Sequence, residues 1–232
     1  MTIHKKSYFK IIIFLLILGI IPITLAQPLL IAHQGGEYWT DKNFSYITKS
    51  IEEGADIIEI DIRLKEGQYI VKHFPFSQVQ GKLIDALDKM QDKQIYLDIK
   101  DESVNPNDLI NFVRERRNNS IIIGSFNKDI LKKVNPESNV TIDFQCLPTR
   151  CSIETAKELN ADWINPLPYF ITKRQINDIE KNGFKFVPAG SENYIKQMQY
   201  AKSGAYAISV YEVGKFKKIL DKYKNKENLN VL

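Results

Sequence analysis

Three carboxylates in the sequence alternate with aliphatic residues in a way that predicts a metal site. One isoleucine separates Glu59 from Asp61, and one isoleucine separates Asp98 from Lys100; Arg63 continues the first series. Because successive side chains of a strand point to opposite faces, the charged residues share one face and the aliphatic residues the other. Charge that faces the interior is costly unless it is paired or binds a metal. Such oxygen ligands favour Mg²⁺ or Ca²⁺, and the alternative is a set of surface salt bridges on an edge strand.

Two histidines could supply acid–base chemistry beside these carboxylates. After the first 26 residues, His33 and His73 are the only histidines, and each follows a short strand-like segment. If these segments end at the C-terminal rim of an α/β barrel, where the active sites of such barrels are assembled, the imidazoles can serve as general base and general acid. Either histidine alone would be better explained as a hydrogen-bonded structural residue. Their combination with the carboxylates favours catalysis.

The elements that must position these residues follow the pattern of repeated βα units. From Pro28 onward, short β-rich segments alternate with helical ones, which is typical of a parallel sheet. The predicted strands span residues 29–33, 56–64, 95–100, 120–125, 140–146, 161–165, 184–189 and 205–211. The predicted helices begin near Asn43, Leu83, Pro106, Lys128, Ser152, Thr172, Glu192 and Lys215. Eight such units favour an α/β fold of the (β/α)8 TIM-barrel type over a doubly wound open sheet, and no G-x-G-x-x-G phosphate loop is present.

The N-terminal segment differs from the rest of the chain. Three lysines precede the apolar run from Ile11 to Ile21, and small residues follow at positions 24–26. This order predicts a secretory signal peptide over residues 1–26, a single domain over residues 27–232, and a location outside the cytoplasm. The alternative is an uncleaved N-terminal membrane anchor, although the apolar run is short against the roughly 20 residues that span a bilayer.

Charge and cysteine content restrict the chemistry further. The three lysines of the N-terminal segment account for most of the formal net charge of +4, so no basic surface for nucleic acid is implied. Cys146 and Cys151 are the only cysteines. In an oxidising compartment such a pair can form a disulfide, whereas a zinc site would need more cysteine or histidine ligands than the chain offers.

Several of these segments resemble the glycerophosphodiester phosphodiesterases. Residues 30–36, Leu-Ile-Ala-His-Gln-Gly-Gly, are similar to that family's opening strand with its His-Arg-Gly motif, and residues 54–63 to its Gly-Ala-Asp and Glu-x-Asp metal segment. Residues 71–73 are similar to the second-histidine motif, residues 98–100 to the Glu-x-Lys of the third strand, and residues 125–127 to the Ser-Phe turn after the fourth. The resemblance extends over nearly the whole chain after the N-terminal segment.

The resemblance implies a TIM barrel with a metal-dependent phosphodiesterase site. Glu59, Asp61 and Asp98 would bind a divalent cation, Mg²⁺ or Ca²⁺, that holds the phosphate of the substrate. His33 and His73 would transfer protons on opposite sides of phosphorus. The expected activity is that of an exported enzyme that hydrolyses small glycerophosphodiesters or lysophospholipid headgroups.

Two departures from the family pattern bear on phosphate binding. Lys100 keeps the position whose charge would neutralise the phosphate, but the arginine after the first histidine is replaced by Gln34. A glutamine can hydrogen-bond phosphate, yet it lacks the charge and the guanidinium fork of arginine. In the loop that follows, the family's Glu-Asn reads Lys42-Asn43. These changes keep open a second class of function, a non-catalytic phosphate- or lipid-binding barrel.

The remaining alternatives concern the substrate. The insertion that usually follows the second histidine is short, and an aspartate stands at Asp98, as in the related sphingomyelinase D type of phospholipase, although that group's loop cysteines are missing. The aromatic residues Tyr38, Trp39, Phe74 and Phe76 lie in predicted rim loops. They could contact a glycerol or acyl group, with transient contact to a membrane surface, or simply pack over the barrel mouth. A metal-independent phosphatidylinositol phospholipase C is disfavoured because such an enzyme does not need three acidic metal ligands.

Overall fold

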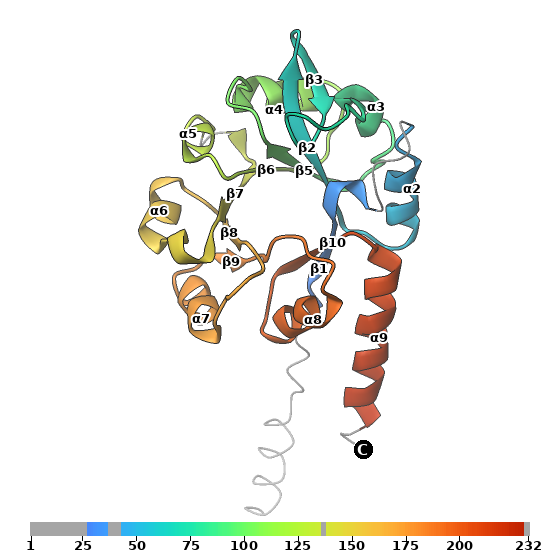
Figure 1. Ribbon diagram of the computed structural model, residues 1–232, viewed down its shortest axis with the longest axis vertical. Helices are drawn as coiled ribbons and strands as arrows, with labels where there is room; N and C mark the ends of the chain where they lie inside the picture. The colour runs from blue at the N-terminus through green and yellow to red at the C-terminus, as the bar shows by residue number, and fades with distance from the viewer. Residues whose placement is uncertain (1–26, 37–42, 136–137, 230–232) are drawn as a thin grey trace, which may run out of the picture.

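The computed structural model describes residues 27–36, 43–135 and 138–229. Its parallel strands, in spatial order, are β10 (Ala207–Val210), β1 (Leu29–Ala32), β2 (Ile57–Lys65), β5 (Gln94–Ile99), β6 (Ile121–Ser125), β7 (Thr141–Cys146), β8 (Trp163–Pro166) and β9 (Lys185–Phe186). The Tyr206 amide donates to the Phe186 carbonyl at 2.9 Å and joins the two ends of this series. The strands form a ring with the helices outside it (Figure 1). The predicted TIM-type barrel is confirmed.

The helices follow the strands as the sequence predicts. They are α2 (Ser45–Glu52), α3 (Leu83–Leu87), α4 (Pro106–Arg114), α5 (Lys128–Leu131), α6 (Ile153–Glu158), α7 (Lys173–Lys181), α8 (Tyr194–Lys202) and α9 (Val213–Leu229), with the 3-10 turns η1 (His33–Gly35) and η3 (Pro148–Arg150). Each of the eight α-helices from α2 to α9 begins within two residues of its predicted start. Local capping explains this agreement: the Asn105 side chain accepts from two backbone amides of α4, and Thr172 forms a capping box with Gln175 at α7. None of the helices in the described segments is long and apolar enough to span a bilayer.

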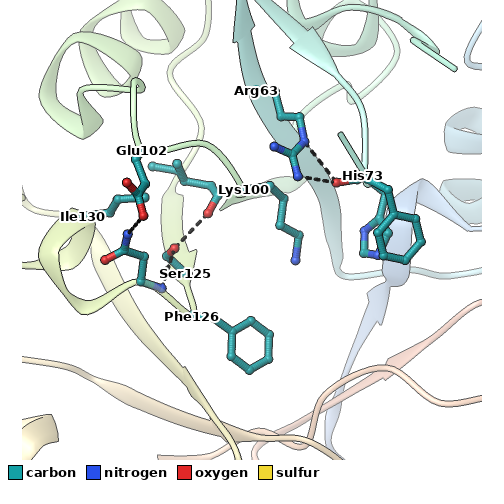
Figure 2. Close-up of a pocket in the computed structure, with 10 residues that line it drawn as sticks. Arg63, His73, Lys100, Glu102, Ser125, Phe126 and Ile130 are labelled. Carbon is teal, nitrogen blue, oxygen red and sulfur yellow. Dashed lines mark hydrogen bonds between the residues drawn. The ribbon is translucent and has the colours of Figure 1, made fainter. Parts of the chain in front are cut away.

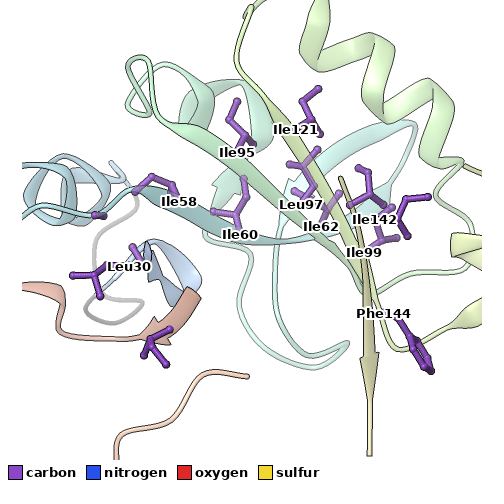
Figure 3. Packing of buried hydrophobic residues seen from close by; sticks show 14 of the residues in the cluster. Leu30, Ile58, Ile60, Ile62, Ile95, Leu97, Ile99, Ile121, Ile142 and Phe144 are labelled. Carbon is purple, nitrogen blue, oxygen red and sulfur yellow. The ribbon is translucent and has the colours of Figure 1, made fainter. Parts of the chain in front are cut away.

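Alternation along the strands produces two apolar layers. The outer layer packs between the strands and the helices and includes Ile58, Ile60 and Ile62 of β2 and Leu97 of β5 (Figure 3). The layer inside the ring contains Ile31, Ile57, Tyr96, Ile122, Trp163, Val187 and Ala207. Each fully buried isoleucine contributes about 1.5–3 kcal/mol relative to an exposed one. The inner layer fills one part of the barrel and leaves the rest to polar side chains.

Strand β2 extends beyond the barrel and forms a hairpin that the sequence-based reading did not predict. Its last residues pair antiparallel with β3 (Gln68–Val71), which in turn pairs with β4 (Gly81–Lys82). The turn consists of Glu66 and Gly67, with φ angles of 50° and 74°. Positive φ at both positions of a two-residue loop is the geometry that matches the twist of paired strands. The hairpin returns the chain to the barrel rim, where the Lys72 amide donates to the Asp61 carbonyl at 3.0 Å.

The two cysteines flank the loop that follows β7. Cys146 and Cys151 form a disulfide in the structure, across a separation of five residues. We expect both to be oxidised in protein recovered from outside the cell, and intact-mass measurement after alkylation without reductant is the check. Alkylation of both thiols would contradict it. The short loop limits the stabilisation to less than the roughly 3 kcal/mol that chain-entropy models give a 15-residue loop.

Candidate active site

The three predicted metal ligands lie together inside the barrel. Glu59, Asp61 and Asp98 are buried, and one oxygen of each lies within 4.8 Å of the others. Glu59 and Asp61 project from β2, and the parallel register pairs Asp61 with Asp98 of β5. In each carboxylate one oxygen has hydrogen-bond partners, while the other, Glu59 Oε1, Asp61 Oδ1 or Asp98 Oδ1, is buried without one. Three buried carboxylates that each offer an oxygen within 4.8 Å of the others fit a divalent cation.

Both predicted histidines hydrogen-bond to these ligands. His33 Nδ1 lies 2.8 Å from Glu59 Oε2, and His73 Nδ1 lies 2.7 Å from Asp61 Oδ2. A carboxylate that accepts from Nδ1–H fixes the tautomer and leaves Nε2 as the nitrogen that can take up a proton. His33 begins η1 directly after β1, whereas His73 reaches the rim on the β2–β3 hairpin. The two imidazoles therefore reach the same carboxylate cluster from different elements.

Lys100 completes the charged cluster. Its Nζ lies 2.5 Å from Asp98 Oδ2 and 3.3 Å from Asp61 Oδ1. Burial opposes the charge of this ammonium, but the neighbouring carboxylates raise its pKa above the ordinary value. Lys100 therefore remains charged at neutral pH and can also interact with a phosphate bound beside the carboxylates.

The pKa values of Asp98 and Asp61 are shifted in opposite directions. Burial, with repulsion from Asp61 and Glu59, raises the pKa of Asp98 to about 6 despite the attraction of Lys100. For Asp61, burial is outweighed by the hydrogen bond from His73 and the charge of Lys100, and its pKa is lowered. Burial would lower the pKa of His33, but Glu59 raises it above 6.5 through its charge and hydrogen bond.

These shifts predict that the metal-free protein becomes less stable as the pH rises between about 4 and about 7. The folded pKa values of Asp98 and Asp143 are about 6 and about 7, above the ordinary 3.8, and that of His33 exceeds 6.5. Each group binds its proton more tightly when folded, so its stabilisation is complete below the unfolded pKa and lost as the pH rises through the folded pKa. Thermal melts in the presence of chelator measure this slope. A melting temperature that rises with pH across this interval would contradict the prediction.

Two predicted residues occupy unexpected positions. Arg63, expected to point into the barrel with the carboxylates, instead lies at the rim, where its Nε and Nη2 donate to the His73 carbonyl at 3.1 and 2.9 Å. It lies on the part of β2 that has left the barrel. Gln34 is buried in the left-handed conformation at φ 53°, with Nε2 3.0 Å from His73 Nδ1. Gln34 therefore contacts His73 through its side chain, in addition to following His33 in the chain.

Four buried polar residues that the sequence reading did not single out extend the site into the barrel. They are Tyr96, Asp143, Gln145 and Asn165. Gln145 Nε2 donates to Asp98 Oδ2 at 2.7 Å, and Tyr96 donates to Asp143. Burial raises the pKa of Asp143 to about 7 although Tyr96 and Asn165 hydrogen-bond it. The same two-residue alternation that identifies Asp98 places Asp143 and Gln145 on the inner face of β7, and this signal could have found them.

Two adjoining cavities lie beside the histidines and Lys100, and the smaller one reaches the carboxylate cluster. One, of about 120 Å³, is lined by His33, Glu59 and Gln145 among others. The second, of about 350 Å³, lies farther out, between Arg63 and Glu102 (Figure 2). They share His73, Lys100 and Phe126 as walls. A ligand with a phosphate in the inner cavity can therefore extend a substituent into the outer one.

The loop after β9 packs against His33 at Gly190. A Cβ atom there would lie 2.6 Å from Cδ2 of His33, too close for any real contact. We therefore expect Gly190→Ala to displace the imidazole and lower turnover severalfold, with little change in melting temperature. Steady-state kinetics beside thermal melts measure both. Gly183→Ala is the contrasting control: it has open space but a φ of 85°, so it should lower stability and leave turnover unchanged. Unaltered turnover in Gly190→Ala would contradict the prediction.

Comparison by sequence matches no protein-family model and no curated protein, whereas comparison by structure finds many similar barrels. A phosphodiesterase from Oleispira antarctica, determined with its product sn-glycerol-3-phosphate, has a TM-score of 0.72 and 16% identity over 84% of this chain and 97% of that chain. The glycerophosphodiester phosphodiesterase from Thermotoga maritima has a TM-score of 0.67 and 17% identity, covering 83% and 98%. The enzyme from Parabacteroides distasonis has a TM-score of 0.66 and 14% identity, covering 85% and 98%. This chain has the TIM-barrel fold of the glycerophosphodiester phosphodiesterases.

Proposed function

We propose that this protein is an exported phosphodiesterase that uses a divalent cation, Mg²⁺ or Ca²⁺, to hydrolyse glycerophosphodiesters. The observation that carries the proposal is the set of three buried carboxylates whose oxygens lie within 4.8 Å of one another, next to two histidines and a lysine. The fold shared with phosphodiesterases supports the same reaction class. Export rests on the lysines and apolar run of residues 1–26, which lie outside the described part of the chain.

Glu59, Asp61 and Asp98 would hold the cation, which when bound supplies charge neutralisation to a phosphodiester. Lys100, beside Asp98, would add a second positive charge to a phosphate oxygen. The family departure at Gln34 leaves this lysine as the main cationic side chain described in the inner cavity. Phosphate recognition would therefore depend on Lys100 more strongly than in relatives that carry arginine.

His33 and His73 would transfer the protons. One imidazole takes the proton from the attacking hydroxyl, of water or of the substrate itself, as the new P–O bond forms. The other gives its proton to the departing alcohol oxygen as the old P–O bond breaks. The Nδ1 contacts with Glu59 and Asp61 would orient both rings for this exchange.

A substrate panel tests this proposal. Purified protein is incubated with glycerophosphocholine, glycerophosphoethanolamine and bis(glycero)phosphate, each with Mg²⁺, Ca²⁺ or chelator, and the products are identified by mass spectrometry. We expect sn-glycerol-3-phosphate or its cyclic ester to form only with a divalent cation. Cation and phosphate binding without turnover of any diester would favour the non-catalytic barrel, with Gln34 as its most direct cause.

Lysophospholipids are a second candidate substrate class, supported by exposed aromatic residues on the rim loops. The rings of Phe74 and Phe76 stack with their centroids 5.3 Å apart, and Phe76 is 86% exposed. Phe170, in the loop after β8, is 90% exposed and held at a φ of 61°, a strained conformation for a bulky residue. Such residues could contact an acyl chain at a lipid surface. Adding lysophosphatidylcholine to the panel, below and above its micelle concentration, separates this candidate from the water-soluble diesters.

A further inference from the structure

The four buried polar residues that extend inward from Asp98 have no part in the proposed proton transfers. Tyr96, Asp143, Gln145 and Asn165 come from β5, β7 and β8, and each is 5% exposed or less. Within the described segments, Asp143 forms no ion pair. Burying polar groups in this way is unfavourable unless they are hydrogen-bonded, so their arrangement calls for an explanation.

The hydrogen bonds among these residues run in one direction. Gln145 Nε2 donates both to Asp98 Oδ2 at 2.7 Å and to the Tyr96 hydroxyl oxygen at 3.0 Å. Because a carboxylate oxygen accepts, the Tyr96 hydroxyl donates its proton to Asp143 Oδ2, and the hydroxyl oxygen accepts from Gln145. Asn165 Nδ2 donates to the same Asp143 oxygen at 2.8 Å. The direction of each bond is thus set by Asp143, whose Oδ2 accepts from both neighbours.

We propose that Asp143 is a positioning residue for the cation site, acting through Tyr96 and Gln145; this rests on the proposed function. Because the Tyr96 hydroxyl donates its hydrogen bond to Asp143, its oxygen faces Gln145 as an acceptor. That acceptor holds the amide nitrogen of Gln145, and not its carbonyl oxygen, toward Asp98. Asp98 Oδ2 is then held between Gln145 and Lys100, and Asp98 Oδ1 is left for the cation.

The chain of hydrogen bonds from Asp143 through Tyr96 to Gln145, called the relay below, fixes the orientation of the Gln145 carboxamide. The shape of the side chain alone does not determine that orientation. The two ends of a carboxamide are nearly identical in shape but opposite in hydrogen-bonding character. An inverted Gln145 carboxamide would place its carbonyl oxygen next to Asp98 Oδ2. Repulsion between these two acceptors would rotate the Asp98 carboxylate away from its position as a metal ligand. Space for the relay is reserved by Gly124 of β6, where a Cβ atom would overlap the Tyr96 side chain. Protonation of Asp143 on its unpartnered Oδ1 would leave Oδ2 an acceptor, so the relay does not depend on that charge.

The test is cation affinity, measured by calorimetric titration of the metal-free protein with Mg²⁺ and with Ca²⁺. Asp143→Asn keeps the side chain's shape but can turn an NH₂ group toward Tyr96, which releases the hydroxyl proton toward Gln145. We expect affinity to fall about tenfold or more, the scale on which outer-shell partners act. Gln145→Leu should weaken binding at least as much. The double variant should bind no more weakly than Gln145→Leu alone, because both residues act in one chain of bonds.

A matched control and a second variant decide the outcome. Asp162→Asn makes the same change just before β8, where Asp162 Oδ2 accepts from the Ile142 amide at 2.8 Å, and it should leave affinity unchanged. Should Asp143→Asn fail to fold, Tyr96→Phe removes only the relaying hydroxyl and is expected to weaken binding likewise. Wild-type affinity in Asp143→Asn, or additive losses in the double variant, would overturn the inference alone. A wild-type protein that binds neither cation would overturn the proposed function and this inference with it.

Discussion

Replacing either His33 or His73 with alanine will lower turnover by about 10² or more, the scale on which positioned acid–base groups contribute. Each imidazole uses Nδ1 to contact a carboxylate, at 2.8 and 2.7 Å respectively, so Nε2 is the nitrogen that we propose for proton transfer. The measurement is kcat on the best diester of the panel at saturating cation. Saturation is necessary because each alanine also removes a hydrogen bond from a predicted metal ligand.

Asparagine variants separate these two roles. His33→Asn and His73→Asn place an amide nitrogen near the position of Nδ1 and remove the ring nitrogen Nε2. We expect them to restore cation affinity while turnover stays as low as in the alanine variants. The wild type should show a bell-shaped pH–rate profile whose limbs belong to the pair, and each variant should lose one limb. Wild-type turnover in either alanine variant would exclude that histidine from the mechanism.

Asp61→Asn will abolish tight binding of divalent cations. The substitution keeps the side chain's shape but removes an anionic oxygen from the cluster in which three carboxylates lie within 4.8 Å. The loss should exceed the roughly 10- to 100-fold effect of removing an outer-shell partner, because Asp61 is itself a proposed ligand. Calorimetric titration with Mg²⁺ and Ca²⁺ is the measurement, and Asp162→Asn serves again as the isosteric control.

Unchanged affinity in Asp61→Asn would assign the carboxylates a different role. Asp61 and Asp98 would then form a salt-bridge network with Lys100, and the non-catalytic barrel would become the better account. Melting temperatures distinguish the two cases. Loss of a purely structural network should lower stability regardless of cation, whereas loss of a metal ligand should remove the stabilisation that added cation confers.

Much of the site could be predicted because strand alternation is a local property of the sequence. Glu59, Asp61 and Asp98 occupy alternate positions among isoleucines and leucine, and a parallel register then brings them together. Arg63 follows the same alternation but was misplaced, since alternation does not reveal where a strand leaves the barrel. The turn of Glu66 and Gly67 carried that information, because a glycine in a two-residue connection between strand-like segments is typical of a hairpin.

The neutral part of the site was harder to predict for a physical reason. A buried charge is costly and therefore attracts attention in a sequence, whereas glutamine and asparagine carry no charge and are mostly exposed, so a sequence does not reveal which of them are buried. Gln145 and Asn165 become informative only when the structure shows which atoms they contact. Gly190 likewise gives no local signal, since its importance comes from the His33 ring packed against it.

The hairpin of β2 and β3 places the two histidines in parts of the molecule with different resistance to local opening. The carboxylates lie on strands with neighbours on both sides in the barrel, whereas His73 follows a four-residue strand whose partners are the extension of β2 and the two-residue β4. Segments with fewer buried contacts open at lower free energy than the core. A molecule with an open hairpin would keep the carboxylates that we propose as cation ligands and lose one of the two proposed proton-transfer groups. Thermal inactivation would then begin below the temperature at which the barrel unfolds, and it would reverse on cooling.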